Sequence, residues 1–228
     1  GRIKPSIVGV GTMMETRTPS GHLLGSGFVV GDGQHVLTNA HVVDNLLDAG
    51  HGEVLVVFVG HGVDAEMRTA KKVALDAAHD LVLLEISGAP LPGLKLGDDG
   101  LVREGEWFAF TGFPIGSVLG LYPATHRGIV SAITPIAAPM GTARQLNPLV
   151  IARLRSSYDV YQLDATAYPG NSGGPMYDIQ TGRVVAIINM VFVKGSKESV
   201  LTKPSGITYA IPIKYAKALL RKKGLGLE

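Results

Sequence analysis

The chain has 228 residues, of which 46% are hydrophobic, so it can bury one large or two small cores. Its 21 basic residues nearly balance its 19 acidic ones, and a net charge of +2 gives no reason to expect a nucleic-acid partner. The sequence contains no cysteine, which excludes disulfide frameworks, thiolate zinc sites, iron–sulfur clusters and cysteine nucleophiles. It also contains no apolar run of the roughly 18 residues that a membrane-spanning helix needs.

Short β-branched segments, separated by many of the 30 glycines and 13 prolines, run through the chain. They predict strands over residues 7–10, 27–30, 54–59, 81–86, 129–133 and 184–193. Short strands with Gly and Pro breaks favour an all-β sandwich or barrel over alternating strands and helices. The Gly- and Pro-rich stretch 88–100 divides these strands into two sets of similar size, which would suit two small barrels.

One clear helical pattern begins after Pro212 and carries cations toward its end. Gly224 stands where a helix C-terminus favours glycine, and the cations suit the negative end of the helix dipole. The apolar residues would share one face: Ile213, Ala216, Leu219 and Leu220. We expect a terminal helix docked on the barrels rather than a membrane or nucleic-acid patch.

Residues 135–148 and 194–205 are predicted to be long surface loops, which are often functional.

The segment most suggestive of chemistry is Pro-Gly-Asn-Ser-Gly-Gly-Pro at residues 169–175. Glycines beside Ser172 let consecutive N–H groups turn toward one point next to the hydroxyl, as an oxyanion site requires. Taken alone, the segment fits a Gly-rich turn with an incidental serine equally well. It also fits the G-x-S-x-G elbow of α/β-hydrolases, but in those enzymes the histidine follows the serine, whereas all seven histidines here precede it. That fold is therefore excluded.

A serine nucleophile needs an imidazole to take its proton and a carboxylate to orient the imidazole. His41 has the most informative setting of the histidines, in Val-Leu-Thr-Asn-Ala-His-Val-Val at 36–43, where a strand runs into a turn. Asp80 opens the apolar segment 81–86, and a buried aspartate needs a donor such as an imidazole N–H. A solvated aspartate at the strand end is an equal alternative for Asp80 alone, and Asp76 is a second candidate carboxylate.

Four segments together closely resemble the trypsin-like serine proteases of the HtrA (Deg) type. They are Gly-Ser-Gly-Phe-Val-Val at 25–30, Leu-Thr-Asn-Ala-His-Val-Val at 37–43, His-Asp-Leu-Val-Leu-Leu at 79–84 and Gly-Asn-Ser-Gly-Gly-Pro at 170–175. Further matches follow in order at 110–116, 128–132 and 206–212. The resemblance implies an all-β, chymotrypsin-type fold of two six-stranded antiparallel β-barrels, at about 7–95 and about 100–211, with a terminal helix at about 213–223. The chain ends just after that helix, so we expect no PDZ domain in it.

The resemblance also implies a serine endopeptidase that works through an acyl-enzyme intermediate. Ser172 would be the nucleophile, His41 the general base and then acid, and Asp80 the residue that orients His41. The N–H groups of Gly170 and Ser172 would bind the oxyanion. No metal or organic cofactor is needed for this chemistry.

By position, the resemblance places Thr166 at the floor of the primary specificity pocket. An uncharged floor gives Arg or Lys no counter-charge, so we expect small to medium apolar side chains in the pocket. Asn189, Met190 and Val191 would form a wall of the pocket and offer backbone groups to an extended peptide.

Ile-Val-Gly-Val at residues 7–10 resembles the freed N-terminus of digestive zymogens, whose amine pairs with an aspartate just before the catalytic serine. That position here is Asn171, and Ile7 is not terminal, so we expect a plain strand and no activation by N-terminal cleavage. Family members are tuned instead by mobile loops, which here would be 135–148, 165–169 and 194–205.

The resemblance implies protein or peptide substrates, a homo-oligomer that would be a trimer by family analogy, and protein quality control in the periplasm or another extracytoplasmic site. The main alternative is a catalytically silent trypsin-like fold that acts as a peptide-binding or scaffold module. Loss of a triad residue would be its signature, and all three residues are present. A metal-binding β protein that uses the histidines would need an H-E-x-x-H motif or a close His/Asp cluster, which the sequence lacks.

Overall fold

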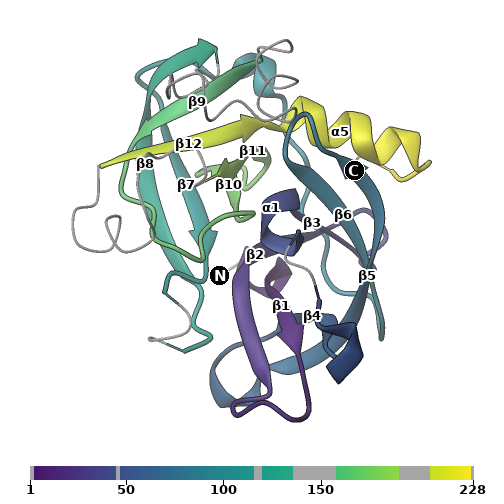
Figure 1. Ribbon diagram of the computed structural model, residues 1–228. Helices are drawn as coiled ribbons and strands as arrows, with labels where there is room; N and C mark the ends of the chain where they lie inside the picture. The colour runs from purple at the N-terminus through teal and green to yellow at the C-terminus, as the bar shows by residue number, and fades with distance from the viewer. Residues whose placement is uncertain (1–2, 45–46, 116–119, 136–157, 190–205, 227–228) are drawn as a thin grey trace, which may run out of the picture.

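The computed structural model describes residues 3–44, 47–115, 120–135, 158–189 and 206–226. Within this part of the chain, twelve strands form two closed six-stranded barrels in which every strand pair is antiparallel (Figure 1). The expected fold class, two six-stranded barrels with a C-terminal helix, is confirmed. None of the helices in these ranges is long and apolar enough to cross a membrane.

The first barrel has the strand order β1-β2-β3-β6-β5-β4 and is closed by the pairing of β1 with β4. Its strands are β1 (Ile7–Met13), β2 (Gly21–Val30), β3 (His35–Asn39), β4 (Val54–Val59), β5 (Glu66–Asp76) and β6 (Leu81–Ile86). Residues 7–10, the segment that resembles a zymogen terminus, lie within β1 as predicted, and Ile7 pairs with Phe28. A short helix, α1 (Ala40–Val43), directly follows β3.

The second barrel repeats the same pattern in the order β10-β11-β12-β9-β8-β7. Its strands are β7 (Trp107–Gly112), β8 (Ala124–Pro135), β9 (Asp159–Asp164), β10 (Pro175–Asp178), β11 (Val184–Asn189) and β12 (Ile207–Pro212). Short 3₁₀ turns are η1 (Lys4–Ser6), η2 (Ala49–His51), η3 (Gly62–Asp64) and η4 (Asp99–Leu101). The strand predicted over 184–193 is described only to Asn189, and the expected loops 135–148 and 194–205 lie outside the described residues except for Pro135.

The strands facing the seam between the barrels are buried on both sides, which explains their continuous apolar runs. In β6, Val82 and Leu84 belong to the core inside the first barrel, whereas Leu81 and Leu83 pack in the core between the barrels. Side chains from the second barrel complete this shared core: Val160, Ile187 and Ile211. The two barrels are therefore held together by apolar packing at their interface.

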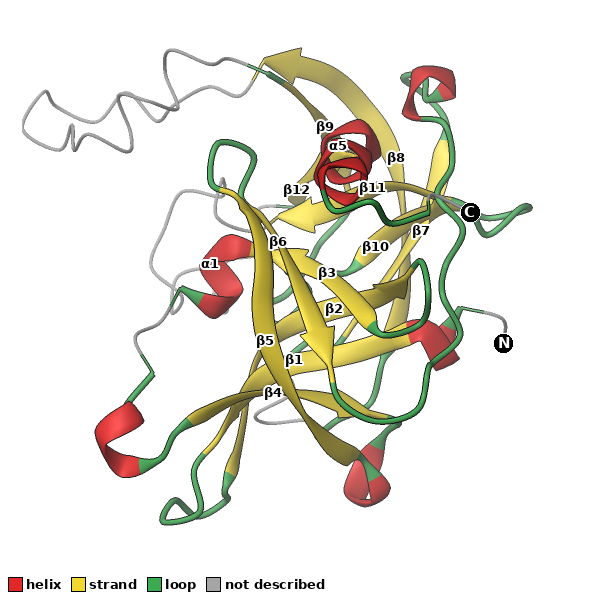
Figure 2. Cartoon of the chain, turned by 90° about the vertical axis from the view of Figure 1, so that its right-hand side faces the viewer, coloured by secondary structure: helices red, strands yellow, loops and turns green. Residues whose placement is uncertain are grey.

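The terminal helix α5 (Ile213–Lys222) buries the predicted apolar face, Ile213, Ala216, Leu219 and Leu220, in the same shared core. Figure 2 shows α5 end-on, lying over the second barrel and next to β6 of the first. Gly224 has a φ of 69°, the left-handed geometry that favours glycine just beyond a helix. The helix thus packs against both barrels.

Candidate active site

The catalytic candidates of the first barrel, His41 and Asp80, are in direct contact. His41 lies in α1, and its Nδ1 is 2.6 Å from Oδ2 of Asp80, while its backbone N–H donates to Oδ1 at 2.9 Å. Asp80 is only 3% exposed. Carboxylate oxygens accept hydrogen bonds, so this contact suits the imidazole tautomer that carries its hydrogen on Nδ1. In that tautomer the lone pair that can take a proton is on Nε2.

The backbone of Asp80 is held in a conformation that costs energy. Its φ of 55° is in the left-handed region, which aspartate tolerates better than most residues but which still costs on the order of 1 kcal/mol. Two hydrogen bonds to its carbonyl oxygen stabilise this geometry, from the N–H of Ala40 at 3.0 Å and from Nδ2 of Asn39 at 3.1 Å. The turn before β6 therefore directs the Asp80 carboxylate toward α1.

The other candidate carboxylate, Asp76, does not contact His41. It ends β5 and bonds to a different imidazole, with Oδ2 2.7 Å from Nδ1 of His79. The His79 ring stacks on Tyr215 of α5, with ring centroids 3.9 Å apart. Asp76 and His79 thus form a second pair at the docking site of the helix, and the structure brings Asp80 alone of the two carboxylates to His41.

Asn189 makes a contact that the sequence analysis missed. It ends β11 of the second barrel, is fully buried, and donates from Nδ2 to Oδ2 of Asp80 at 2.7 Å. We predicted it only as a wall of the specificity pocket. The signal in the sequence is a polar amide that closes the apolar strand Val-Val-Ala-Ile-Ile-Asn, because a buried amide there needs a partner. Met190 and Val191, predicted beside it, lie outside the described residues.

Ser172 lies in a tight turn between β9 and β10 and is 6% exposed. Its carbonyl oxygen accepts a hydrogen bond from the N–H of Ser26 in β2 at 2.8 Å, so the turn is attached to the first barrel. The next N–H, of Gly173, donates to Ile188 of β11 at 2.9 Å. The nucleophile candidate is therefore held from both barrels.

The glycines on either side of Ser172 are sterically required. Gly170 has a φ of 100°, and a Cβ there would lie 2.2 Å from the carbonyl oxygen of Phe113. Gly173 has a φ of 85°, and a Cβ there would lie 2.1 Å from the carbonyl oxygen of Ser26. Both positions combine left-handed backbone with contact too close for any side chain. The backbone of the turn is therefore fixed on both sides of Ser172.

Asn171, between the oxyanion candidates, is 1% exposed, and neither polar atom of its side-chain amide has a hydrogen-bond partner among the described residues. A buried polar group without a partner costs free energy, so the position of this amide is set by the packing of the turn rather than by hydrogen bonds of its side chain to the described residues.

Thr166, the predicted pocket floor, follows β9 and is partly buried. The residues on either side of it are held by the hydroxyl of Thr208 in β12, which donates to the carbonyl of Ala165 at 2.7 Å and accepts from the N–H of Ala167 at 3.0 Å. These bonds attach the segment to the second barrel. No charged side chain stands at position 166 itself.

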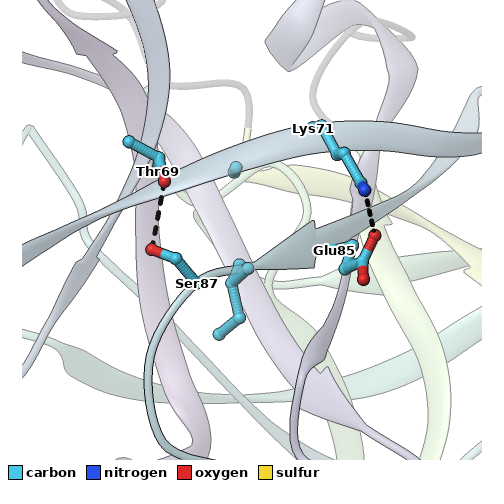
Figure 3. A pocket seen from close by; sticks show the side chains of 6 residues that line it. Thr69, Lys71, Glu85 and Ser87 are labelled. Carbon is cyan, nitrogen blue, oxygen red and sulfur yellow. Dashed lines mark hydrogen bonds and ion pairs between the residues drawn. The ribbon is translucent and has the colours of Figure 1, made fainter.

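One hollow in the described surface lies away from these residues (Figure 3). It is formed by β5, β6 and the residue after β6, where Thr69 donates to Ser87 at 3.0 Å and Lys71 pairs with Glu85 at 2.8 Å. None of the triad candidates lines it. The described residues also bring no group of three His, Asp or Glu side chains together that could hold a metal ion.

The chain belongs to the trypsin-like peptidase family, because the model of the trypsin-like peptidase domain matches residues 25–187. Its relatives within that family are serine proteases of the HtrA and DegP type. A protein of Halomonas elongata named "Probable periplasmic serine endoprotease DegP-like" is 32% identical over 197 residues, which cover 85% of this chain and 33% of that protein. A protein of the same name in Chlamydia trachomatis is 34% identical over 196 residues, 86% of this chain and 33% of that one. The chain thus spans about a third of the length of these curated relatives.

Among solved structures, the HtrA-type protease AlgW, determined with a decapeptide, superposes with a TM-score of 0.68 at 25% identity. The match covers 97% of this chain and 65% of that one. The resemblance in fold therefore extends over nearly the whole chain, including both barrels.

Proposed function

We propose that this chain is a serine endopeptidase whose triad is Ser172, His41 and Asp80. The observation that carries the proposal is the His41–Asp80 pair at 2.6 Å, on the barrel to which the carbonyl of Ser172 is itself hydrogen-bonded through Ser26. Membership of the trypsin-like peptidase family supports the same activity.

In the proposed reaction, Oγ of Ser172 attacks the carbonyl carbon of the scissile peptide bond while Nε2 of His41 takes the hydroxyl proton. The Asp80 carboxylate orients the ring through Nδ1 and stabilises the imidazolium. The N–H groups of Gly170 and Ser172 bind the negative oxygen of the tetrahedral intermediate. His41 then gives its proton to the leaving amine, and an acyl-enzyme remains. Water attacks the acyl carbon while Nε2 of His41 takes a proton from it, and His41 returns that proton to Oγ of Ser172 as the acid product leaves.

The substrate proposed for the primary pocket is a residue with a small to medium apolar side chain. Thr166 offers no charge to pair with Arg or Lys, and burying an unpaired cation would be costly. We place Asn189, Met190 and Val191 beside the bound peptide, with Asn189 contributing its backbone because its side chain bonds to Asp80.

We further propose an extracytoplasmic role in protein quality control or regulated proteolysis. The support is that the curated relatives described above are named periplasmic endoproteases. An unfolded protein or a peptide can present an extended backbone and an apolar side chain to such an uncharged pocket. Homo-oligomerisation as a trimer remains a family-based expectation, which analytical ultracentrifugation of the full chain would test.

A fluorophosphonate probe tests the activity, because it labels an activated serine and ignores an ordinary one. We expect labelling of the native chain, none of Ser172→Ala, and full labelling of Ser131→Ala, which removes an exposed serine of β8 as a matched control. A native chain without labelling or peptide cleavage would favour the silent scaffold instead.

Cleavage of a peptide library tests the specificity of the primary pocket. A preference for Arg or Lys at the cleaved position would contradict the role given to Thr166.

A further inference from the structure

We propose that Ser26 is a positioning residue for the oxyanion site, so that the first barrel supplies both the general base and the geometry of the Gly170 amide on the second barrel. The inference rests on the proposed function. It assigns a role to the serine of the Gly-Ser-Gly motif at 25–27, which the triad chemistry leaves unexplained.

Ser26 is fully buried in β2, and its hydroxyl joins two segments of the second barrel. The hydroxyl donates to the carbonyl oxygen of Gly170 at 2.6 Å and accepts from the N–H of Phe113, just after β7, at 2.8 Å. A serine hydroxyl has one hydrogen to donate, so the bond to Gly170 uses its donor capacity. The bond from Phe113 fixes the direction of that donor.

The backbone of Ser26 strengthens the same connection. Its N–H donates to the carbonyl of Ser172 at 2.8 Å, and its own carbonyl accepts from the hydroxyl of Thr38 at 2.7 Å. One residue of the first barrel therefore binds two carbonyls of the nucleophile turn, those of Gly170 and Ser172. These are the two residues whose N–H groups we propose as oxyanion donors.

Gly170 needs such support because a glycine backbone rotates more freely than any other. The carbonyl before it, of Pro169, accepts from the N–H of Ile115 at 2.7 Å. In a trans peptide the carbonyl and the N–H point in opposite directions, so this bond directs the Gly170 N–H away from Ile115. The Ser26 hydroxyl holds the carbonyl of Gly170 itself, on the other side of its Cα. The two bonds thus fix the peptide planes before and after the Gly170 Cα, whose φ is 100°.

The packing leaves space for this hydroxyl at the expense of a side chain. A Cβ at Gly112, the last residue of β7, would lie 2.7 Å from Oγ of Ser26 and 2.8 Å from Oδ1 of Asn171. No side chain fits between the two polar groups. Glycine at this position is therefore what allows the hydroxyl to reach the nucleophile turn.

The test is Ser26→Ala, measured as kcat and KM on a peptide substrate. We expect kcat to fall by about 10- to 100-fold with KM within about threefold of native, because an oxyanion donor acts in the transition state and not on the bound substrate. A peptide boronate, which forms a tetrahedral adduct with the serine, should lose affinity by a similar factor. A product-like peptide acid should bind nearly as before, and the pH profile should keep its shape because the His41–Asp80 pair is untouched.

Two further variants separate positioning from stability. Ser26→Cys keeps a hydrogen-bonding group, but a thiol donates weakly and its sulfur is larger than the hydroxyl oxygen, so its kcat should also fall below native. Thr12→Val removes another buried hydroxyl of the first barrel, one that bonds to Glu53, and should lower the melting temperature without changing kcat or boronate affinity.

Native kcat and boronate affinity in folded Ser26→Ala or Ser26→Cys would overturn the inference and leave the proposed protease activity intact. Equal losses in Thr12→Val at the same melting temperature would overturn it as well, since the effect would then be one of general stability. Failure of the proposed function is a separate outcome, visible as a native chain that the fluorophosphonate does not label.

Discussion

The side-chain amide of Asn189 lies 2.7 Å from Oδ2 of Asp80, the same oxygen that is 2.6 Å from Nδ1 of His41. Asn189 comes from β11 of the second barrel, whereas Asp80 and His41 belong to the first. The carboxylate is therefore held across the seam, and its alignment with His41 depends on both barrels packing correctly. This contact joins the hydrogen bonds of Ser26 as a polar connection between the barrels at the proposed site.

Replacing Asn189 should weaken both stability and activity. In Asn189→Ala the Asp80 carboxylate loses a buried donor, so we expect a loss of about 1–3 kcal/mol in unfolding free energy and a fall in kcat of about tenfold. Urea unfolding and peptide cleavage measure the two effects. Thr111→Val is the control, because it removes a buried hydroxyl of the second barrel that bonds to Tyr177 and not to the triad. Unchanged kcat in folded Asn189→Ala would contradict an orienting role for this amide.

The two aspartates near the β5–β6 turn should differ sharply in function. Asp80→Asn presents His41 with an amide that can hold the wrong tautomer, and the expected loss in kcat is about 10³–10⁴-fold. Asp76→Asn changes a carboxylate that bonds to His79 instead, so its kcat should stay within about threefold of native. Steady-state cleavage of one peptide by both variants measures the difference. Similar losses from the two substitutions would show that the pairing of His41 with Asp80 is not the catalytic one.

The glycine after the nucleophile should tolerate no side chain. Gly173→Ala adds a Cβ 2.1 Å from the carbonyl of Ser26 at a φ of 85°, so we expect loss of labelling by fluorophosphonate and a stability loss above about 3 kcal/mol. Gly206→Ala is the matched control, since its φ is 69° but nothing lies within 4 Å of the added Cβ. The control should lose only about 1 kcal/mol to backbone strain. Equal effects would mean that strain, and not collision, dominates at Gly173.

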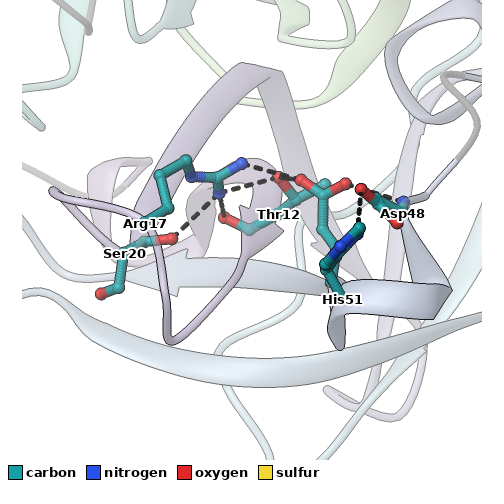
Figure 4. Close-up of polar contacts among 6 residues, drawn as sticks. Thr12, Arg17, Ser20, Asp48 and His51 are labelled. Atoms are coloured by element: carbon teal, nitrogen blue, oxygen red, sulfur yellow. Dashed lines mark hydrogen bonds and ion pairs between the residues drawn. The ribbon is translucent and has the colours of Figure 1, made fainter.

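The far end of the first barrel should make stability depend on acid pH (Figure 4). The hydroxyl of Thr12, the backbone N–H of Asp48 and the guanidinium of Arg17 all bond to the Glu53 carboxylate and lower its pKa to about 2 from an ordinary 4.5. A carboxyl with a lowered pKa in the folded state stabilises the fold above pH 4.5, and this contribution is lost as the pH falls toward 2.

The measurement is the melting temperature of the native chain and of Glu53→Gln between pH 7 and about pH 2. As the pH falls over this range, the free energy of unfolding should decrease by up to about 2 kcal/mol more in the native chain than in the variant. Solvent screening keeps this difference below what the pKa shift alone would give. Parallel curves for the two proteins would show that the Glu53 bonds contribute no net stability.

The sequence alone predicted an all-β fold, and its resemblance to a known family supplied the two-barrel architecture and the triad candidates. Short β-branched runs separated by frequent Gly and Pro predicted the strands, because β-branched residues favour strands and Gly and Pro end them. The glycines around Ser172 predicted an unusual backbone, since only glycine adopts left-handed φ without strain. The helix after Pro212 was predictable because its apolar residues recur at the spacing that places them on one face of a helix.

Tertiary structure decided which of the candidates act on one another. Residue types alone left Asp76 beside Asp80 as a candidate, and the family resemblance chose Asp80. In the structure the left-handed backbone of Asp80 directs its carboxylate to His41, whereas Asp76 bonds to His79. The sequence did not predict the partners of Asn189 and Ser26. Asp80 lies 109 residues from Asn189, and Gly170 lies 144 residues from Ser26. Periodicity and propensity are local properties of the chain, whereas hydrogen bonds across the seam depend on how two closed barrels pack face to face.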